Sequence, residues 1–399
     1  MTRTLDYRIY DADNHYYEPD DCFSRHIEPA YKDRTMRVDR SSAGPGRMYV
    51  GEERCHFFSV GAGDSIGPPG IMKDFLRGVS DEGGSPSLSP MDGLTIPEFV
   101  DRKARLAKMD EQNVEATLML PTTGVGLEVQ LREPQHREAL YPSLRAFNRW
   151  LEEDWGYGAD GRIYGAPILS LLDLDEALAE FERLLALGAR FVVVTAGPVD
   201  GKSPGHPDFD PFWARVQEAR TNVVYHIGRT PFSEMYNTPW GLRPHPPSHR
   251  HSLMEYALSF TERPVVDTLT ALIADNTFGR FPDLRILTVE YGSSWVAPML
   301  HKLDHIARLF SKDLWRFGQP PLTPSETFRR NVWVAPFYED DVVALSSLIG
   351  AERVLAGSDY PHPEGLAEPC EFIEELEGLP ALDQRRILFH NFEELVAAS

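Results

Sequence analysis

Carboxylate and imidazole side chains stand at the ends of several short apolar runs of this 399-residue chain. The candidates are Asp13, His15, Glu18, His226, Glu290, Asp359 and His362. Alternation along an extended chain places Asp13 and His15 on the same side of the first run. If these residues meet at one point, their carboxylates repel one another unless a cation neutralises them. Imidazole and carboxylate donors suit Zn, Mn or Fe, so the pattern predicts a divalent metal site.

The expected ligands of this metal are rich in oxygen. They comprise the four carboxylates of Asp13, Glu18, Glu290 and Asp359 and the two imidazoles of His15 and His226. That balance moves the expected metal from Zn toward Mn or Fe and leaves room for two metals. Two of the acids have alternative roles. Glu290 could orient a ligand or the substrate from behind, and Glu18, beside Pro19, could cap a loop.

Eight short apolar runs carry these residues. They span residues 7–12, 116–120, 163–171, 191–195, 222–226, 285–289, 332–337 and 353–357. They are rich in aliphatic and β-branched residues and do not alternate with polar ones, as in strands buried on both faces of a parallel sheet. Segments with helical periodicity lie between them, including residues 96–112, 174–187, 264–278 and 296–309. This alternation predicts an α/β fold, a (β/α)8 TIM barrel in one domain spanning residues 1–399, whose strand ends meet at one catalytic face.

Two long insertions interrupt the alternation. Residues 29–95 follow the first strand and residues 229–254 follow the fifth, and both are rich in Pro, with Gly and Ser abundant in the first. Loops of this length are uncommon unless they act as lids or interfaces, and both would lie at the catalytic face. We expect them to form a lid or a subunit contact, with surface linkers as the alternative. His249 and His251 lie in the second insertion, where a solvated loop is favoured over a ligand pair and their role stays open.

Composition excludes several classes of function. The formal net charge is −21, which disfavours binding to nucleic acid or to anionic membranes. Three scattered cysteines offer no disulfide framework. The N-terminal residues do not resemble a signal peptide, and no apolar run is long enough to span a bilayer. We therefore expect a soluble cytoplasmic protein.

The motifs at the strand ends resemble those of the amidohydrolase superfamily, in the amidohydrolase-2 branch that includes aminocarboxymuconate-semialdehyde decarboxylase and resorcylate-type decarboxylases. The similar segments are YDADNHYYEP, VVYHIG, FPDLRILTVEYGSSWVAPML, VLAGSDYPHPEG and HNFEELV. The resemblance implies that Asp13, His15, His226 and Asp359 hold the metal. Two positions depart from the usual family pattern, because Asp13 and Glu290 stand where histidine is common.

The resemblance implies a metal-dependent hydrolase or non-oxidative decarboxylase acting on a small organic acid. The metal would act as a Lewis acid and Asp359 as the proton shuttle, with His226 or His362 assisting in proton transfer. Arg229 or Arg243 could pair with a substrate carboxylate, although solvated loop charges are the more ordinary role.

Two other functions remain open at this point. A carboxylate-rich site also suits a dinuclear non-haem Fe/Mn oxygenase built on the same barrel. The other is a non-catalytic subunit that retains the barrel, which the intact donor residues argue against. For partners, we expect a homo-dimer or a hetero-oligomer with a related subunit, in addition to the small-molecule substrate.

Overall fold

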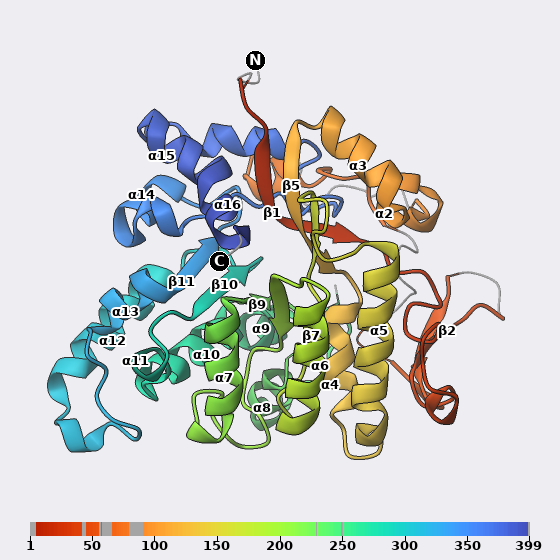
Figure 1. Cartoon of the computed structure of the whole chain (residues 1–399), viewed down its shortest axis with the longest axis horizontal. Helices are drawn as coiled ribbons and strands as arrows, with labels where there is room; N and C mark the ends of the chain where they lie inside the picture. The colour runs from red at the N-terminus through yellow and green to blue at the C-terminus, as the bar shows by residue number, and fades with distance from the viewer. Residues whose placement is uncertain are drawn as a thin grey trace.

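Eight parallel strand segments form the centre of the molecule, with helices around them (Figure 1). The computed structural model describes residues 5–41, 45–55, 57, 66–79, 91–228, 230–248 and 250–397. One sheet has the order β1-β5-β6 and another the order β11-β10-β9-β8-β7. The strands are β1 (Ile9–Tyr16), β5 (Val114–Pro121), β6 (Ile163–Gly165), β7 (Ile168–Leu169), β8 (Phe191–Val194), β9 (Asn222–His226), β10 (Arg285–Val289) and β11 (Val332–Ala335).

Backbone hydrogen bonds connect the two sheets on both sides. The run expected at residues 163–171 is divided into β6 and β7, because Pro167 has no N–H to donate. The pairing nevertheless continues: Ala166 N–H donates to the carbonyl of Met119 at 3.0 Å, and Val193 N–H donates to that of Pro167 at 2.8 Å.

Residues 354–360 complete the ring on the other side. Leu355 N–H donates to Val334 O at 2.9 Å, and Ala12 N–H donates to Ala356 O at 2.8 Å. The expected eighth strand at 353–357 is only an isolated bridge between Val334 and Val354, but its position between β11 and β1 is that of the eighth barrel strand. The arrangement is therefore that of the expected (β/α)8 barrel.

The larger helices connect successive strands and cover the outside of the ring (Figure 1). They are α3 (Arg102–Glu111), α5 (Leu140–Asp154), α6 (Leu174–Ala186), α7 (Asp210–Ala219), α10 (Arg263–Ala274), α12 (Val296–Leu309), α13 (Pro324–Asn331) and α14 (Val342–Ile349). Shorter helices are α1 (Lys73–Leu76), α2 (Pro97–Val100), α4 (Leu127–Leu131), α8 (Phe232–Asn237), α9 (Leu253–Glu255), α11 (Thr277–Arg280), α15 (Ala381–Arg385) and α16 (Asn391–Val396).

Helix boundaries follow local capping groups. α6 begins after Asp173, whose carboxylate accepts N–H groups of the first turn, and ends before Gly188 at φ 88°. Two helices expected to be continuous are broken in the structure. Asp101 is extended and caps a new helix, so the segment 96–112 becomes α2 and α3. Asn276 adopts φ 59° and ends the segment 264–278 early, between α10 and α11.

The first insertion contains a small antiparallel sheet of its own. It consists of β2 (Met36–Asp39), β3 (Arg47–Val50) and β4 (Glu53–Arg54) in the order β2-β3-β4, beside the barrel (Figure 1). Later in the same insertion, Met72 N–H donates to Pro363 O at 3.0 Å, which attaches it to the loop after residue 359. The second insertion contributes α8 and α9 and contacts the first, since Ser248 N–H donates to Phe57 O at 2.7 Å.

Candidate metal centre and acid–base pair

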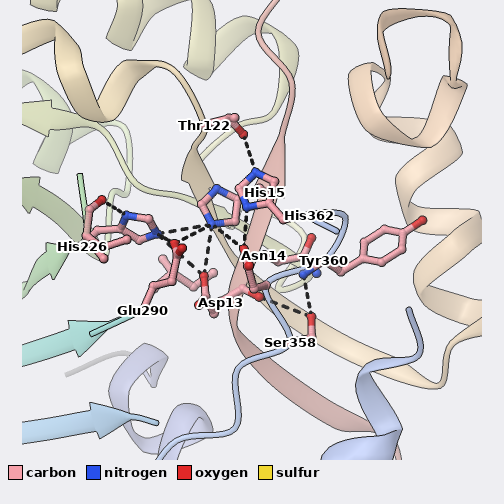
Figure 2. Close-up of polar contacts among 12 residues, drawn as sticks. Asp13, Asn14, His15, Thr122, His226, Glu290, Ser358, Tyr360 and His362 are labelled. Atoms are coloured by element: carbon pink, nitrogen blue, oxygen red, sulfur yellow. Dashed lines mark hydrogen bonds and ion pairs between the residues drawn. The ribbon is translucent and has the colours of Figure 1, made fainter. Parts of the chain in front are cut away.

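Four of the expected ligands converge at the carboxyl ends of three strands (Figure 2). Asp13 and His15 come from β1, His226 ends β9, and Glu290 follows β10. His15 Nε2 lies 3.2 Å from Asp13 Oδ1 and 3.3 Å from His226 Nε2. His226 Nε2 is in turn 3.1 Å from Glu290 Oε2. One ligand atom from each of the four residues lies within 4.8 Å of all the others.

A second group overlaps the first on the side of the eighth strand position. Asp359 Oδ1 lies 3.4 Å from His15 Nε2 and 2.6 Å from His362 Nδ1. Together with Glu290, these three residues again bring one ligand atom each within 4.8 Å. Asp359 therefore touches the cluster on one side and an imidazole on the other.

The arrangement of lone pairs fits a divalent cation. His226 Nδ1 lies 2.7 Å from the carbonyl of Ile227, which only accepts, so Nδ1 carries a hydrogen. Nε2 is the ring atom that faces the cluster, and it offers a lone pair once a cation displaces its proton. Asp13 Oδ1 is buried without a hydrogen bond of good geometry, although it faces His15 Nε2. A single N–H on His15 cannot serve Asp13, Asp359 and His226 at once, whereas one metal ion accepts donors from every side.

Two of the acids sit in unusual backbone conformations. Glu290 has φ 59° and Asp359 has φ 57°, in the left-handed region that few residues other than glycine adopt. Each directly follows a buried strand segment, and the left-handed turn directs the chain sharply as it leaves the barrel. Strain of this kind persists where surrounding contacts enforce it, and it concentrates at functional sites.

A buried hydrogen-bond network connects the two chain segments that carry Asp13 and Asp359. Asp11 accepts hydrogen bonds from the backbone N–H of Ser358 at 2.9 Å, from Ser358 Oγ at 2.6 Å and from Asn14 Nδ2 at 2.8 Å. Ser358 Oγ accepts from Tyr360 N–H at 3.1 Å, so the network flanks Asp359 on both sides. Because Asp11 and Asn14 belong to β1, it ties the strand of Asp13 to the strand of Asp359.

Arg105 of α3 extends this network into the core. Its side chain is completely buried, and its guanidinium donates to His15 O at 2.8 Å, to Glu98 O at 2.6 Å and to Asn14 Oδ1. It also lies over the ring of Tyr360, 5.1 Å from the centroid. Arg105 therefore fixes the backbone between the two ligands that β1 supplies.

Burial and mutual repulsion control the charges of the acids. Burial, followed by the charges of Glu290 and Asp13, raises the pKa of Asp359 well above its ordinary value. Burial also raises the pKa of Glu290. Three buried carboxylates so close together resist full ionisation, and a divalent cation replaces the protons that relieve this repulsion.

The two histidines of the cluster behave differently. Burial, followed by the charge of His362, lowers the pKa of His15 to about 3, which favours its neutral, ligand-competent form. For His226, burial opposes the charged form, but hydrogen bonds to Asp13 and Glu290 outweigh it and raise the pKa to about 10. At Asp13, hydrogen bonds with His15 and His226 overcome burial and lower the pKa to about 2. A divalent cation that binds Nε2 of His226 would displace the proton of this ion pair.

Glu18 lies outside both ligand groups. Its side chain is buried, and its Oε1 accepts the N–H groups of Thr123 at 3.0 Å and of Gly124 at 2.8 Å. This is the loop-capping alternative rather than the expected metal position. Glu18 therefore fastens the loop after β5 to the end of β1.

Arg243, one of the two residues expected to bind a substrate carboxylate, is paired with another side chain. Arg243 forms a bidentate pair with Glu255, at 2.8 Å and 2.6 Å, and so supports the second insertion instead. Arg229 and His249 fall outside the described residues. The ring of His251 packs on Phe260, with centroids 4.6 Å apart, and His251 belongs to neither ligand group.

Sequence reasoning missed Asp11, Asn14, Arg105 and Thr122. Asp11 and Asn14 lie inside the motif that contains Asp13, and the same alternation that pairs Asp13 with His15 puts Asp11 on their side of the strand. For Arg105 and Thr122 no sequence signal was available, because their contacts join distant segments: Arg105 meets Asn14 across 91 positions, and Thr122 meets His362 across 240.

Within the part of the chain that the structure describes, every helix is too short or too polar to cross a bilayer.

Known proteins share this fold over nearly the whole chain. An amidohydrolase from Mycobacterium avium subsp. paratuberculosis is 35% identical with a TM-score of 0.90, and the match covers 99% of each chain. A 2,6-dihydroxybenzoate decarboxylase from Rhizobium is 17% identical with a TM-score of 0.60, over 98% of each chain. A dihydroxybenzoic acid decarboxylase from Polaromonas, with bound manganese and the inhibitor 2-nitroresorcinol, is 16% identical with a TM-score of 0.62, over 98% of this chain and 97% of that one.

No curated protein matches the chain. The sequence profile described as Amidohydrolase matches residues 79–396, which include the strand ends that bear His226, Glu290 and Asp359. That profile and the 35% identical structure carry the same family description, and the similar structure agrees with the barrel. This chain belongs to the amidohydrolase family.

Proposed function

We propose that this chain is a divalent-metal-dependent, non-oxidative decarboxylase of a small aromatic acid. The proposal is supported by the acidic and imidazole donors at the barrel mouth and by the decarboxylases among the proteins with the same fold. Manganese is the metal of first choice, because a donor set that mixes carboxylates with imidazoles suits it and the Polaromonas enzyme holds manganese.

The observation that carries the proposal is the position of Asp359. Its Oδ1 lies 3.4 Å from His15 Nε2 in the ligand group and 2.6 Å from His362 Nδ1. Decarboxylation requires that the carbon which loses CO2 keep the electron pair of the broken C–C bond and take up one proton. A carboxyl group held at the metal ligands, with a raised pKa and an imidazole beside it, is suited to deliver that proton.

The other residues have supporting roles in this scheme. A bound metal supplies Lewis acidity that orients the substrate carboxylate and its neighbouring oxygen. Asp13, His15, His226 and Glu290 would hold it, and Asp359 would complete the set from the side of His362. Tyr291 donates from its hydroxyl to the carbonyl of His226 at 3.1 Å and so steadies the end of β9. His362 restores the proton on Asp359 after each turnover.

We favour one ion per chain over two. Both ligand groups include His15 and Glu290, and one imidazole nitrogen binds a single ion. The dinuclear Fe/Mn oxygenase would need separate donors for its second ion, so it remains the alternative to be tested by stoichiometry. Hydrolysis of a small organic acid would use the same Lewis acid and Asp359, and it is tested with the same panel of substrates.

The two insertions are proposed to form a lid over this site. Two backbone hydrogen bonds support this proposal. One joins residues 66–79 to the loop after Asp359, and the other joins the two insertions to each other. The lid would determine substrate size, and its exposed side is the proposed contact in a dimer.

The decisive experiment combines metal analysis with product analysis. Purified protein is loaded with Mn²⁺, its metal content is measured per chain, and CO2 release is followed with hydroxybenzoates. We expect about one ion per chain and CO2 without O2 consumption. Two iron-containing ions with O2 uptake would support the oxygenase, and a chain that binds no divalent metal would contradict the proposal.

A further inference from the structure

Thr122, the first residue after β5, joins β1 to His362. Its hydroxyl oxygen lies 2.6 Å from the carbonyl of Tyr16. It also lies 3.2 Å from His362 Nε2 (Figure 2). Thr122 carries neither a carboxylate nor an imidazole, and it contacts the second ligand group through His362.

Counting hydrogens assigns each of these contacts. A hydroxyl has one hydrogen, and a carbonyl oxygen only accepts, so the hydrogen of Thr122 points to Tyr16. Toward His362, the hydroxyl oxygen can then only accept. His362 Nε2 must therefore carry a hydrogen, and Nδ1 is the ring atom that faces Asp359 Oδ1 at 2.6 Å.

We propose that Thr122 is a positioning residue that fixes the orientation and tautomer of His362, with Nε2 directed to Thr122 and Nδ1 directed to Asp359. The inference rests on the proposed function, because it assigns a partner to the proposed acid–base pair. Without the acceptor at Thr122, the hydrogen of a neutral His362 could lie on either ring nitrogen, and the ring could turn over.

The surroundings make Thr122 a rigid reference point. Glu18 holds the N–H groups of the next two residues, Thr123 and Gly124. Gly124 has no space for a side chain, since a Cβ there would meet Pro121 Cβ at 2.8 Å and Phe147 Cζ at 2.9 Å. The loop therefore cannot move outward without breaking buried contacts.

The imidazole of His362 is also held on its face. It stacks on the ring of His15, with centroids 4.2 Å apart and an interplanar angle of 30°. Stacking sets the plane of the ring but leaves its two nitrogens interchangeable by a half turn. Only the edge contacts distinguish them, and these are Thr122 on one side and Asp359 on the other.

The test compares Thr122→Val, Thr122→Ala and Thr122→Ser. Valine keeps the shape of threonine and removes the acceptor, whereas serine keeps the acceptor. Thr327→Val is the matched control, because Thr327 is a buried threonine of α13 whose hydroxyl has no hydrogen-bond partner. We expect Thr122→Val to lower kcat about tenfold to a hundredfold, in the range of positioned acid–base groups, with KM and metal content within about twofold of wild type.

Serine should restore most of kcat, and Thr327→Val should leave it unchanged. Equal kcat in wild type and Thr122→Val, or loss of metal in step with kcat, would overturn the proposal. Thr122→Ala provides the same comparison if valine prevents folding.

A second readout does not depend on activity. In Zn²⁺-loaded protein, which is diamagnetic, ¹⁵N spectra of the histidine rings identify the tautomer, with His362→Gln used for assignment. Wild type and Thr122→Ser should show the hydrogen of His362 on Nε2, and Thr122→Val should lose this pattern. An unchanged pattern overturns the inference, whereas a wild type that shows the pattern but has no decarboxylase activity refutes only the proposed function.

Discussion

The ligand cluster and the second insertion lie at the same end of the barrel but are stabilised in different ways. Around the cluster, Asp13, His15 and Asp359 are buried, and backbone bonds join their strands. The second insertion instead has short helices with exposed apolar residues, among them Trp240 at 66% and Leu253 at 88% exposure. Only a rigid region can hold donors to the tolerance that a metal needs, while a loosely supported one can vary with the substrate.

The largest effect is expected at Asp359, within the rigid region. Asp359→Asn removes a ligand charge and the proton donor together, so kcat for CO2 release should fall by about a thousandfold or more, with weaker metal binding. Asp33→Asn, at an exposed aspartate of the first insertion, is the control and should behave as wild type. Activity within tenfold of wild type in Asp359→Asn would show that another residue supplies the proton.

The next effect tests whether the buried network makes the cluster rigid. Arg105→Met keeps much of the volume but leaves the carbonyl of His15 and the side chain of Asn14 without donors. We expect the free energy of unfolding to fall by about 3 kcal/mol, measured by urea denaturation. A loss below about 1 kcal/mol would mean that the network contributes little and that packing alone holds β1.

A smaller, pH-dependent effect is expected in the second insertion. Hydrogen bonds from Arg243, despite opposition from burial, hold the pKa of Glu255 well below its ordinary value. A lowered folded-state pKa means that the pair stabilises the insertion above the ordinary glutamate pKa, and that this stability is lost as the pH falls below it. The protection of the amides in residues 250–260, after correction for the slower intrinsic exchange in acid, should therefore fall as the pH drops from about 5 to about 3.

Glu255→Gln is the comparison for this effect. The variant should exchange faster than wild type at pH 6 and show a weaker response to acid. If wild type and variant respond alike, other groups control the insertion, and its support does not depend on the Arg243 pair.

The smallest effect on stability is expected at Trp240, on the exposed surface of the second insertion. Trp240→Ser should change the free energy of unfolding by less than about 0.5 kcal/mol, because the side chain is mostly exposed in the folded protein and its removal loses little buried contact area. If the insertion forms the proposed dimer contact, the same variant should shift the protein toward monomer in light scattering. A large loss of stability in the monomer would show that Trp240 is packed more firmly than its exposure indicates.

Much of the fold and most of the ligand cluster follow from local sequence. Apolar runs mark the barrel strands because both of their faces are buried, and polar residues directly after them must lie at the mouth. The family indicated by these motifs is confirmed by the profile match and by the similar structure. The roles of the cluster residues stay predictions until metal and activity are measured.

What sequence could not provide depends on tertiary contacts. Glu18 was expected among the ligands, but the N–H groups that it caps belong to a loop 105 positions away. Arg243 was a candidate for binding substrate, but in the structure it is paired with Glu255. The division at Asp101 was missed because its capping conformation interrupts an otherwise helical pattern.

The backbone bond from Asp359 N–H to Asp13 O, 2.7 Å long, links the two ends of the chain at the cluster. Asp11 and Ser358, which reinforce this link, are 347 positions apart. During synthesis, therefore, the first ligands emerge long before the last, and the full set exists only after the C-terminal part has been made and the ring has formed. Metal binding is then a late step in folding. A truncated chain would lack Asp359, and a half-folded chain would not place it at the cluster, so metal affinity would report whether folding is complete.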